Sequence, residues 1–279
     1  MKNFTEHKVD QDFSNTRIDR WFRQYFEDLS HNNLEKYLRK GFIRVNEKKI
    51  KSSYRLNEGD IIKTSVFINN FLSNDKKIKK IYGSEDFIKK NTLHIDNDLL
   101  VINKPFNLAV QGGTGIKRNL DDLLVSAFSD KKITPRLVHR LDKETSGVML
   151  IALNRKMASH LSNLFKTKNV HKTYWAITEG EPEKTTGEIN LIINDDEKKQ
   201  RQKSLTKYNK VLKINDNISW IAFRPITGRT HQIRKHASMS NFPIVGDKKY
   251  GNKNNKIIKF NKLHLHSHSV DFKGLNGDI

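Results

Sequence analysis

The sequence HRLDKETSGVMLIALNR, residues 139–155, joins a charged loop to an apolar run that predicts a buried β-strand. A loop held against a rigid sheet is a frequent position for catalytic side chains. Within this loop Asp142 lies between Arg140 and Lys143, and the two cations favour the ionised carboxylate that a nucleophile or a base requires. Taken alone, such a segment is more often a solvated surface loop, so the surrounding sequence has to distinguish the two interpretations.

The chain has 279 residues and a large excess of basic side chains, 52 Lys and Arg against 31 Asp and Glu, which gives a net charge of +21. The excess occurs both before and after residue 90, so both parts of the chain are candidates for contact with a polyanion such as nucleic acid. A membrane surface is the alternative polyanion, but no basic amphipathic helix stands out. An enzyme of small neutral metabolites has no need of this charge.

Cysteine is absent, which excludes disulfides, thiolate zinc sites and iron–sulfur clusters. The N-terminal residues lack the apolar core of a signal peptide, and no apolar run approaches the roughly 18 residues of a transmembrane helix. The length suffices for one large domain and a small one. We therefore expect a soluble, cytoplasmic protein that does not associate with a membrane.

Residues 13–68 have the pattern of a small separate unit. An apolar face at helical spacing predicts its first helix, with the members Ile18, Trp21, Phe22, Tyr25 and Phe26. A second helix is predicted over 33–40, because Gly41 is a usual C-terminal stop signal. Residues 42–50 predict a tight hairpin, and residues 56–62 predict a turn and a closing strand.

The phrase LRKGFIRVNEKKIKSSYRLNEGDII, residues 38–62, resembles the S4-like RNA-binding domain. It departs from that family at Glu47, where glycine usually occupies the hairpin turn. The resemblance implies RNA contact by basic side chains of this unit, which we expect to be Arg17, Arg20, Arg39, Lys40 and Arg44. A basic helical adaptor without an RNA role is the alternative.

Residues 69–90 are polar and show no sustained period, so they are expected to form a linker. The pattern then changes to many short strands with a few helices over 91–279. Predicted strands cover 99–105, 148–153, 171–178, 205–212, 218–223 and 262–270, and predicted helices cover 157–165 and 230–238. Because the strands come in runs, the fold class is α+β, with a largely antiparallel mixed sheet.

A second informative segment is TGRTHQIRKHA, residues 227–237. A helix after the glycine turn would place His231, Arg234, Lys235 and Ser238 on one cationic face. Such a helix could direct Arg234 at a carboxylate or a phosphate, for which the rigid guanidinium is better suited than an ammonium. A basic surface helix without a specific role is the other interpretation.

A third segment, residues 171–177, predicts a strand in which Tyr174 lies on the face opposite Trp175 and Ile177. If Trp175 and Ile177 face the core, the ring of Tyr174 is free to stack on a nucleic-acid base, an interaction that contributes roughly 1–3 kcal/mol. Without further context an ordinary strand tyrosine is the more common explanation.

These three segments, in this order after an S4-like unit, resemble the RluA-type family of pseudouridine synthases. The matching phrases are LLVINKP, RLVHRLDKETSGVMLIALN, KTYWAITEG, PITGRTHQIRKHAS, PIVGDKKYG and LHLHS, which span about 98–267. The domain arrangement and length are most similar to the C and D members, which modify large ribosomal RNA. The resemblance implies a pseudouridine synthase domain that isomerises specific uridines of structured RNA, with 23S ribosomal RNA as the expected substrate.

The resemblance also implies roles for individual residues. Asp142 is the essential carboxylate, Tyr174 stacks on the target base, Arg234 pairs with Asp142, and Arg140 supports the loop or a phosphate. We further expect RNA contacts from Arg229 and Lys235. The reaction involves neither oxidation nor hydrolysis, so no cofactor or metal is expected, and the chain is expected to be a monomer. Asp142 could attack the anomeric carbon, add to the uracil ring or remove the ribose 2′ proton; the sequence leaves these routes open.

Three other patterns in the sequence partly match known functional motifs. Residues 112–115 with Lys117 have the glycine content of a phosphate loop but not its spacing. The alternating histidines 264, 266 and 268 would share one face of a strand and could hold a metal, although the intervening leucines favour an ordinary half-buried strand. Residues 139, 142 and 146 contain His, Asp and Ser, but on one short loop without the elbow motif of a hydrolase.

A non-catalytic RNA-binding or ribosome-assembly factor with the same fold is the main functional alternative. The chain also ends soon after the last predicted strand, whereas members of the family usually continue through a longer tail. This departure leaves open a truncated C-terminus.

Overall fold

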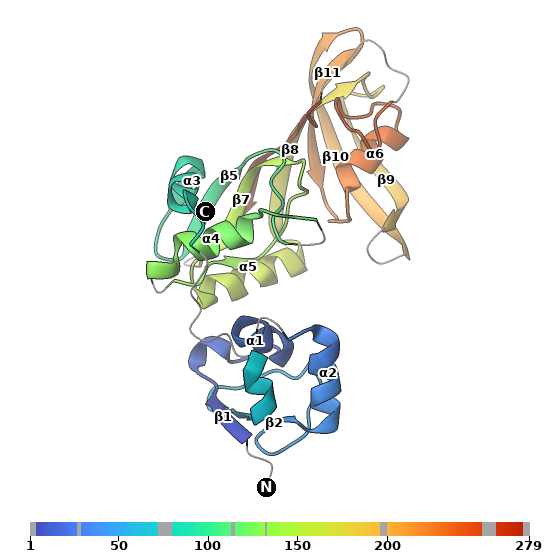
Figure 1. Ribbon diagram of the computed structural model, residues 1–279. Coiled ribbons are helices and arrows are strands. Elements are labelled where there is room, and N and C mark those ends of the chain that lie inside the picture. The colour runs from blue at the N-terminus through green and yellow to red at the C-terminus, as the bar shows by residue number, and fades with distance from the viewer. Residues whose placement is uncertain are drawn as a thin grey trace. The chain divides into compact units, whose positions relative to one another are not determined.

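The computed structural model describes residues 4–26, 29–71, 80–112, 115–131, 133–195, 200–252 and 261–275. The chain divides into two compact units, Met1–Lys77 and Ile78–Ile279 (Figure 1). The division falls within the predicted linker over 69–90, but the end of that prediction is wrong. Residues Ser84–Asn91 form helix α3, whose Ile88 is buried in the core of the larger unit.

The smaller unit combines two helices with a three-stranded antiparallel sheet in the order β1-β3-β2. Its main elements are β1 (Phe4–Lys8), α1 (Ile18–Tyr25), α2 (His31–Lys40), β2 (Ile43–Val45) and β3 (Ile61–Ser65). The side chain of Ser30 caps α2, and Gly41 ends it with a φ of 73°. Both predicted helices are confirmed, whereas β1 was not predicted.

The turn after β2 explains how Glu47 replaces the expected glycine. Asn46 and Glu47 have φ angles of 46° and 64°, so both central residues of the turn adopt the left-handed conformation. The carboxylate of Glu47 pairs with Lys63 on β3, and the side chain of Asn46 donates to Asp60 at 2.8 Å. These side-chain contacts hold the turn in the absence of glycine.

The larger unit is built on a mixed sheet in the order β4-β5-β7-β12-β8-β11-β10-β9, with β6 paired to β7. Its strands are β4 (Thr92–Ile95), β5 (Leu99–Lys104), β6 (Arg136–Leu137), β7 (Ser146–Ala152), β8 (Val170–Glu179), β9 (Thr186–Asp195), β10 (Gln200–Asn215), β11 (Ile218–Pro225) and β12 (Leu265–Phe272). In the described residues only β7 and β12 pair in parallel. The predicted largely antiparallel α+β architecture is confirmed for this unit.

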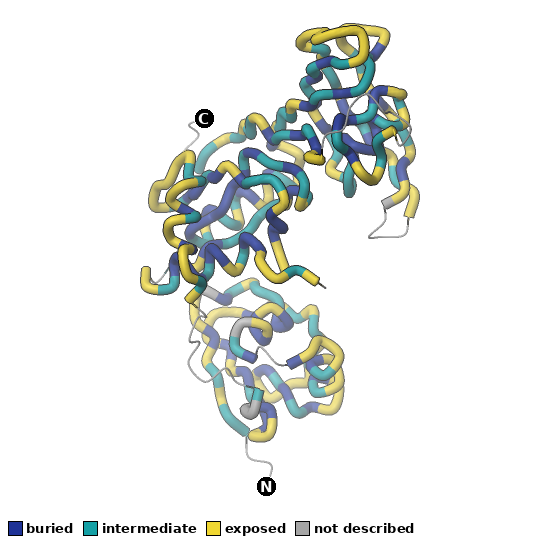
Figure 2. The backbone as a smooth tube through the Cα atoms, turned by 45° about the horizontal axis from the view of Figure 1, so that its top comes forward, coloured by how far each residue is buried: buried dark blue, intermediate teal, exposed yellow. Residues whose placement is uncertain are grey.

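Strand β7 is buried on both faces, which explains the apolar run at 148–153. Met149 and Ile151 pack in the core that contains α4 (Leu120–Ala127), and Leu150 and Ala152 pack with α5 (Arg155–Thr167). The helix α6 (Gln232–Met239) lies against the other half of the sheet, beside β9 and β10 (Figure 1). Figure 2 shows buried stretches within each unit.

Gly147 is the second residue of this buried strand, at a point where no side chain fits. Its φ is 113°, and a Cβ there would lie 2.2 Å from the carbonyl oxygen of Ser267. Ser267 is the partner of Gly147 in the parallel pairing of β7 with β12. The close approach of these two backbones therefore fixes where the loop before β7 ends.

We expect Gly147→Ala to lower the free energy of unfolding by about 3 kcal/mol or more, because it combines a left-handed backbone with a steric clash. Gly83→Ala is the matched control, since its φ is 72° but an added Cβ meets nothing within 4 Å. That change should lower stability by only about 1 kcal/mol. Urea unfolding compares the variants, and equal losses would contradict the close approach.

Candidate active site

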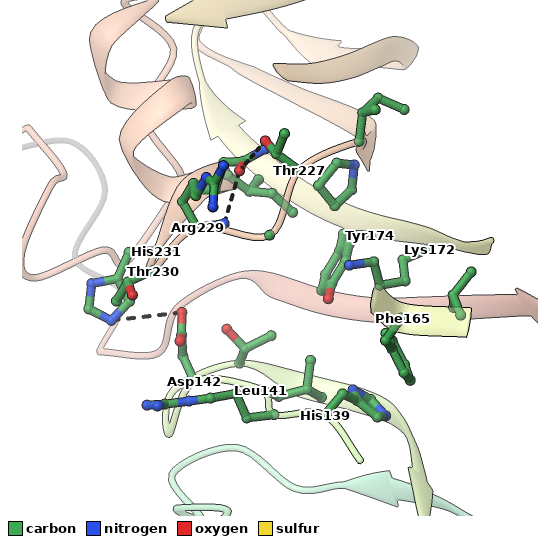
Figure 3. Close-up of a pocket in the computed structure, with 18 of the residues that line it drawn as sticks. His139, Leu141, Asp142, Phe165, Lys172, Tyr174, Thr227, Arg229, Thr230 and His231 are labelled. Carbon is green, nitrogen blue, oxygen red and sulfur yellow. Dashed lines mark hydrogen bonds and ion pairs between the residues drawn. The ribbon is translucent and has the colours of Figure 1, made fainter. Parts of the chain in front are cut away.

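A cavity of about 480 Å³ in the larger unit collects the three segments that the sequence singled out. Asp142 contributes from the loop before β7, Tyr174 from β8, and residues 225–234 from the end of β11 and the start of α6 (Figure 3). Among the described residues that line it, Asp142 is the only carboxylate. Segments far apart in the sequence thus meet around one acidic side chain.

A buried lysine, Lys104, holds the loop of Asp142 by a hydrogen bond to its backbone. Lys104 is fully buried at the end of β5, and its ammonium donates to the carbonyl oxygens of Pro105 (3.0 Å), Leu108 (2.8 Å) and Lys143 (3.3 Å). Burial lowers the pKa of Lys104 to about 8, against the opposing effect of Asp142. Because Lys143 follows Asp142 directly, this bond restrains the catalytic candidate itself.

Arg234 does not pair with Asp142, so that prediction is wrong. Its Nε donates to Oδ2 of Asp247 and its Nη2 to Oδ1, both at 2.7 Å, and Nη2 also lies 3.1 Å from Oε2 of Glu144. Burial would raise the pKa of Asp247, but the hydrogen bonds from Arg234 and nearby backbone N–H groups lower it below its ordinary value. Arg234 therefore links α6 to the loop that carries Asp142 through Glu144.

His231 is the side chain that lies beside Asp142. Its Nε2 is 3.8 Å from Oδ2 of Asp142 (Figure 3), and its Nδ1 is 3.0 Å from the hydroxyl of Tyr250. Burial lowers its pKa, with Asp142 opposing that effect. The predicted helix from residue 230 is wrong at its start: His231 has a φ of 54°, and α6 begins at Gln232. Because His231 itself has a left-handed backbone conformation, its side chain points into the cavity instead of lying on the face of the helix.

Tyr174 lines the cavity, but the predicted reason for its orientation is wrong. Trp175 is 36% exposed and stacks on His268, whereas Ala176, on the same face as Tyr174, is buried. Burial, followed by the charge of Asp142, raises the pKa of Tyr174 to about 12, so it is a neutral phenol at neutral pH. Its ring is held by the core while it faces the cavity (Figure 3).

Comparison with known proteins decides the family. Residues 98–239 match the model of the RNA pseudouridylate synthase family. The chain is 38% identical to "Ribosomal large subunit pseudouridine synthase C" of Rickettsia conorii over 91% of this chain and 88% of the relative, and 32% identical to the protein of that name from Vibrio vulnificus over 95% and 87%. The chain belongs to the RNA pseudouridylate synthase family. It is an isomerase of the RluA type, as its resemblance predicted.

Solved structures agree with this membership. "Human RNA Pseudouridylate Synthase Domain Containing 4" superimposes with a TM-score of 0.59 at 29% identity, covering 70% of this chain and 90% of that one. "Human RNA Pseudouridylate Synthase Domain Containing 1" gives a TM-score of 0.57 at 26% identity, covering 68% and 80%. The synthase fold is therefore common to chains whose sequences differ at most positions.

The remaining expected site residues of this synthase have different environments. Arg140 is exposed at the rim of the cavity, and Arg229 also lines it, with its Nε donating to the carbonyl oxygen of Lys203 at 3.4 Å. Lys235 is only 7% exposed, and its ammonium donates to the carbonyl oxygen of Asn194. Lys235, which was expected to contact RNA, is therefore directed at β9 within the fold.

His139 and Ser146 have structural partners of their own. The Nε2 of His139 accepts a hydrogen bond from the N–H of Leu150 at 2.9 Å, and its ring stacks on Phe165. Ser146 lies 2.9 Å from Nδ1 of His266 on β12. Neither side chain is joined to Asp142 as in a hydrolase triad, so the structure contradicts that alternative.

The three alternating histidines do not form a metal site in the described residues, which contain no group of three potential ligands. His264 contacts the carbonyl oxygen of Lys262, and His268 stacks on Trp175. The glycine-rich segment at 112–115 lies partly outside the described residues. Within the part of the chain that the structure describes, no helix is long and apolar enough to cross a membrane.

We expect Asp247→Asn to lower the free energy of unfolding by about 3 kcal/mol, because it leaves a buried guanidinium with an incomplete counter-charge. Asp216→Asn is the control, since that carboxylate is 95% exposed in its pair with Lys213, and its loss should change stability by less than about 1 kcal/mol. Urea unfolding measures both. An Asp247 variant as stable as the control would refute the structural role of this pair.

The stability of the chain should also depend on pH through His139. Burial lowers its pKa from 6.5 to about 3, so below pH 6.5 the unfolded chain takes up a proton that the folded chain does not. The free energy of unfolding therefore falls as pH falls from 6.5 toward 3, by about 2 kcal/mol at pH 5 from this residue. His139→Gln, which cannot titrate, should remove that part of the difference between pH 7.5 and pH 5. An unchanged pH dependence in the variant would show that protonation of His139 does not cause the loss of stability at low pH.

Proposed function

We propose that this synthase isomerises specific uridines of 23S ribosomal RNA to pseudouridine, with Asp142 as the single essential carboxylate. The observation that carries the proposal is the cavity in which Asp142 and the neutral ring of Tyr174 are surrounded by cations. Relatives named for the large ribosomal subunit, which match over most of this chain, support the choice of RNA. Action on ribosomal RNA also agrees with the cytoplasmic location that the sequence predicted.

The isomerisation requires few catalytic groups beyond Asp142 and Tyr174. The bond from uracil N1 to the ribose anomeric carbon breaks, the base turns, and the bond re-forms from C5, which loses its proton while N1 gains one. An ionised Asp142 can begin this by attacking the anomeric carbon, by adding to the uracil ring or by removing the ribose 2′ proton. Each route needs the carboxylate at a fixed position, which the contacts of its loop with Lys104 and Arg234 provide.

Tyr174 is placed to hold the base while the carboxylate acts. A uridine must leave its helix to enter the cavity, and unstacking requires a few kcal/mol. Stacking on the phenol ring offsets part of this, by roughly 1–3 kcal/mol. The cations at the rim, Arg140 and Arg229, are suited to the phosphates of the distorted strand.

We also propose that the smaller unit is an S4-like RNA-binding domain. Arg20, Arg39 and Lys40 are exposed on α1 and α2. Arg17 pairs with Asp19 at 2.6 Å, and Arg44 donates to the carbonyl oxygen of Gly41 at 3.1 Å. The three exposed cations are available to phosphates, whereas Arg17 and Arg44 are already oriented by partners of the protein. The monomeric state expected from the sequence stays a prediction.

Asp142→Asn should abolish pseudouridine formation, at least about a thousandfold in rate, and leave RNA affinity within a few-fold of the unsubstituted enzyme. The reason is that the amide keeps the size of the side chain but can neither attack nor accept a proton. The measurement combines pseudouridine mapping of 23S ribosomal RNA, with and without the gene, and binding of the purified variant to the same RNA. Modification that persists with the Asn variant would favour another catalytic group. Mapped sites that do not depend on the gene would instead favour an RNA-binding assembly factor.

A further inference from the structure

Lys172 is a cation in the active-site cavity that the proposed chemistry does not use. It lies on β8 two residues before Tyr174, on the same face of the strand, and it lines the same cavity. Figure 3 shows both side chains projecting from the strand into the cavity. The nitrogen is 4.0 Å from the point where a Cβ would project from Gly228, so it lies against the turn that precedes α6.

No carboxylate of the described residues pairs with the ammonium of Lys172. Among the described residues its side chain makes no hydrogen bond or ion pair, unlike the buried Lys104, which has three carbonyl acceptors. Burial is what lowers the pKa of Lys172, and no carboxylate opposes the shift. The charge of Asp142 acts instead on Lys104, Tyr174, His231 and Arg234. A partly buried cation of this kind destabilises the free protein unless an anion arrives to pair with it.

We propose that Lys172 binds a backbone phosphate adjoining the uridine whose base lies on Tyr174. This rests on the proposed function, because the RNA supplies the anion. The two residues lie about 7 Å apart along the strand, so a nucleotide stacked on the Tyr174 ring would have a backbone phosphate within reach of the lysine side chain. A neutral uracil carbonyl would give a hydrogen bond but no countercharge, so a phosphate fits the unpaired ammonium better.

The same wall of the cavity suits an anion. Lys166 and Lys168, at the end of α5, and Arg229, after β11, line the cavity together with Lys172. Lys166 and Lys168 are exposed, whereas Arg229 and Lys172 are half-buried. Lys172 projects from the same face of β8 as Tyr174, so its charge lies in the same wall of the cavity as the ring. We therefore infer that it sets the register of the strand in the cavity.

The test uses a synthetic RNA hairpin that contains a mapped target uridine, with either all natural phosphates or one neutral methylphosphonate beside that uridine. Lys172→Met and Lys172→Gln remove the charge, Lys172→Arg keeps it, and Lys90→Met removes an exposed charge of α3 outside the cavity. Binding and single-turnover rates are measured at several salt concentrations, and urea unfolding checks that each variant folds.

We expect the two neutral variants to bind the natural hairpin about tenfold more weakly or worse, and the slope of log affinity against log salt to fall by about 1. Lys172→Arg should recover most of the affinity, and Lys90→Met should change little. One methylphosphonate should weaken the unsubstituted enzyme similarly but add no further loss to Lys172→Met.

Losses that multiply for every methylphosphonate position, or an unchanged salt slope in both neutral variants, would overturn the proposal. An effect on kcat alone with equal affinity would assign Lys172 to the base instead of the phosphate, and this too would overturn it. Failure of the unsubstituted enzyme to modify either the hairpin or ribosomal RNA would reject the proposed function. The activity of the unsubstituted enzyme therefore separates this outcome from a failure of the proposal for Lys172.

Discussion

The buried pair of Arg234 and Asp247 is the interaction on which the arrangement of the active site depends. Both side chains are nearly inaccessible, at 3% and 1% exposure, so neither charge is stable without the other. The guanidinium has a further contact with Glu144, two residues after Asp142. A helix at one edge of the cavity is thereby fastened to the loop at the other. This ion-pair network positions the loop of Asp142 without burying the Asp142 carboxylate.

The opposite support comes from packing. Strand β7 is buried on both faces, and near its start the backbone of Gly147 lies in close contact with the backbone of β12. Lys104 then ties the same loop to the end of β5. The loop is therefore held by a packed strand, a buried ammonium and a buried guanidinium. These restraints leave the carboxylate of Asp142 partly exposed in the cavity, which is the condition for contact with a substrate.

Local patterns in the sequence were sufficient for α1, α2, α5 and most of α6, for most strands and for the family, because apolar periodicity and motif spacing depend on neighbouring residues. They missed α3 and α4. They were insufficient where contacts join distant segments. Arg234 was assigned to Asp142, since the sequence does not reveal that Asp247 turns toward the same guanidinium. Lys235 was read as a surface cation for the same reason. The role of Lys104 had no local signal, because its three acceptors are backbone carbonyls. Asp247 was visible in the motif GDKKYG. Pairing it with Arg234 would have required knowing that the guanidinium is buried beside it.

The most direct test of this account asks whether Glu144 and Arg234 act as one unit on Asp142. RNA labelled with tritium at C5 of uridine loses the label when C5 joins the ribose, so single-turnover tritium release reports the chemical step. Glu144→Gln, Arg234→Lys and the double variant would be compared with the unsubstituted enzyme. If the two residues work through one contact, the double variant is no slower than the slower single variant. Rate losses that simply multiply would contradict it.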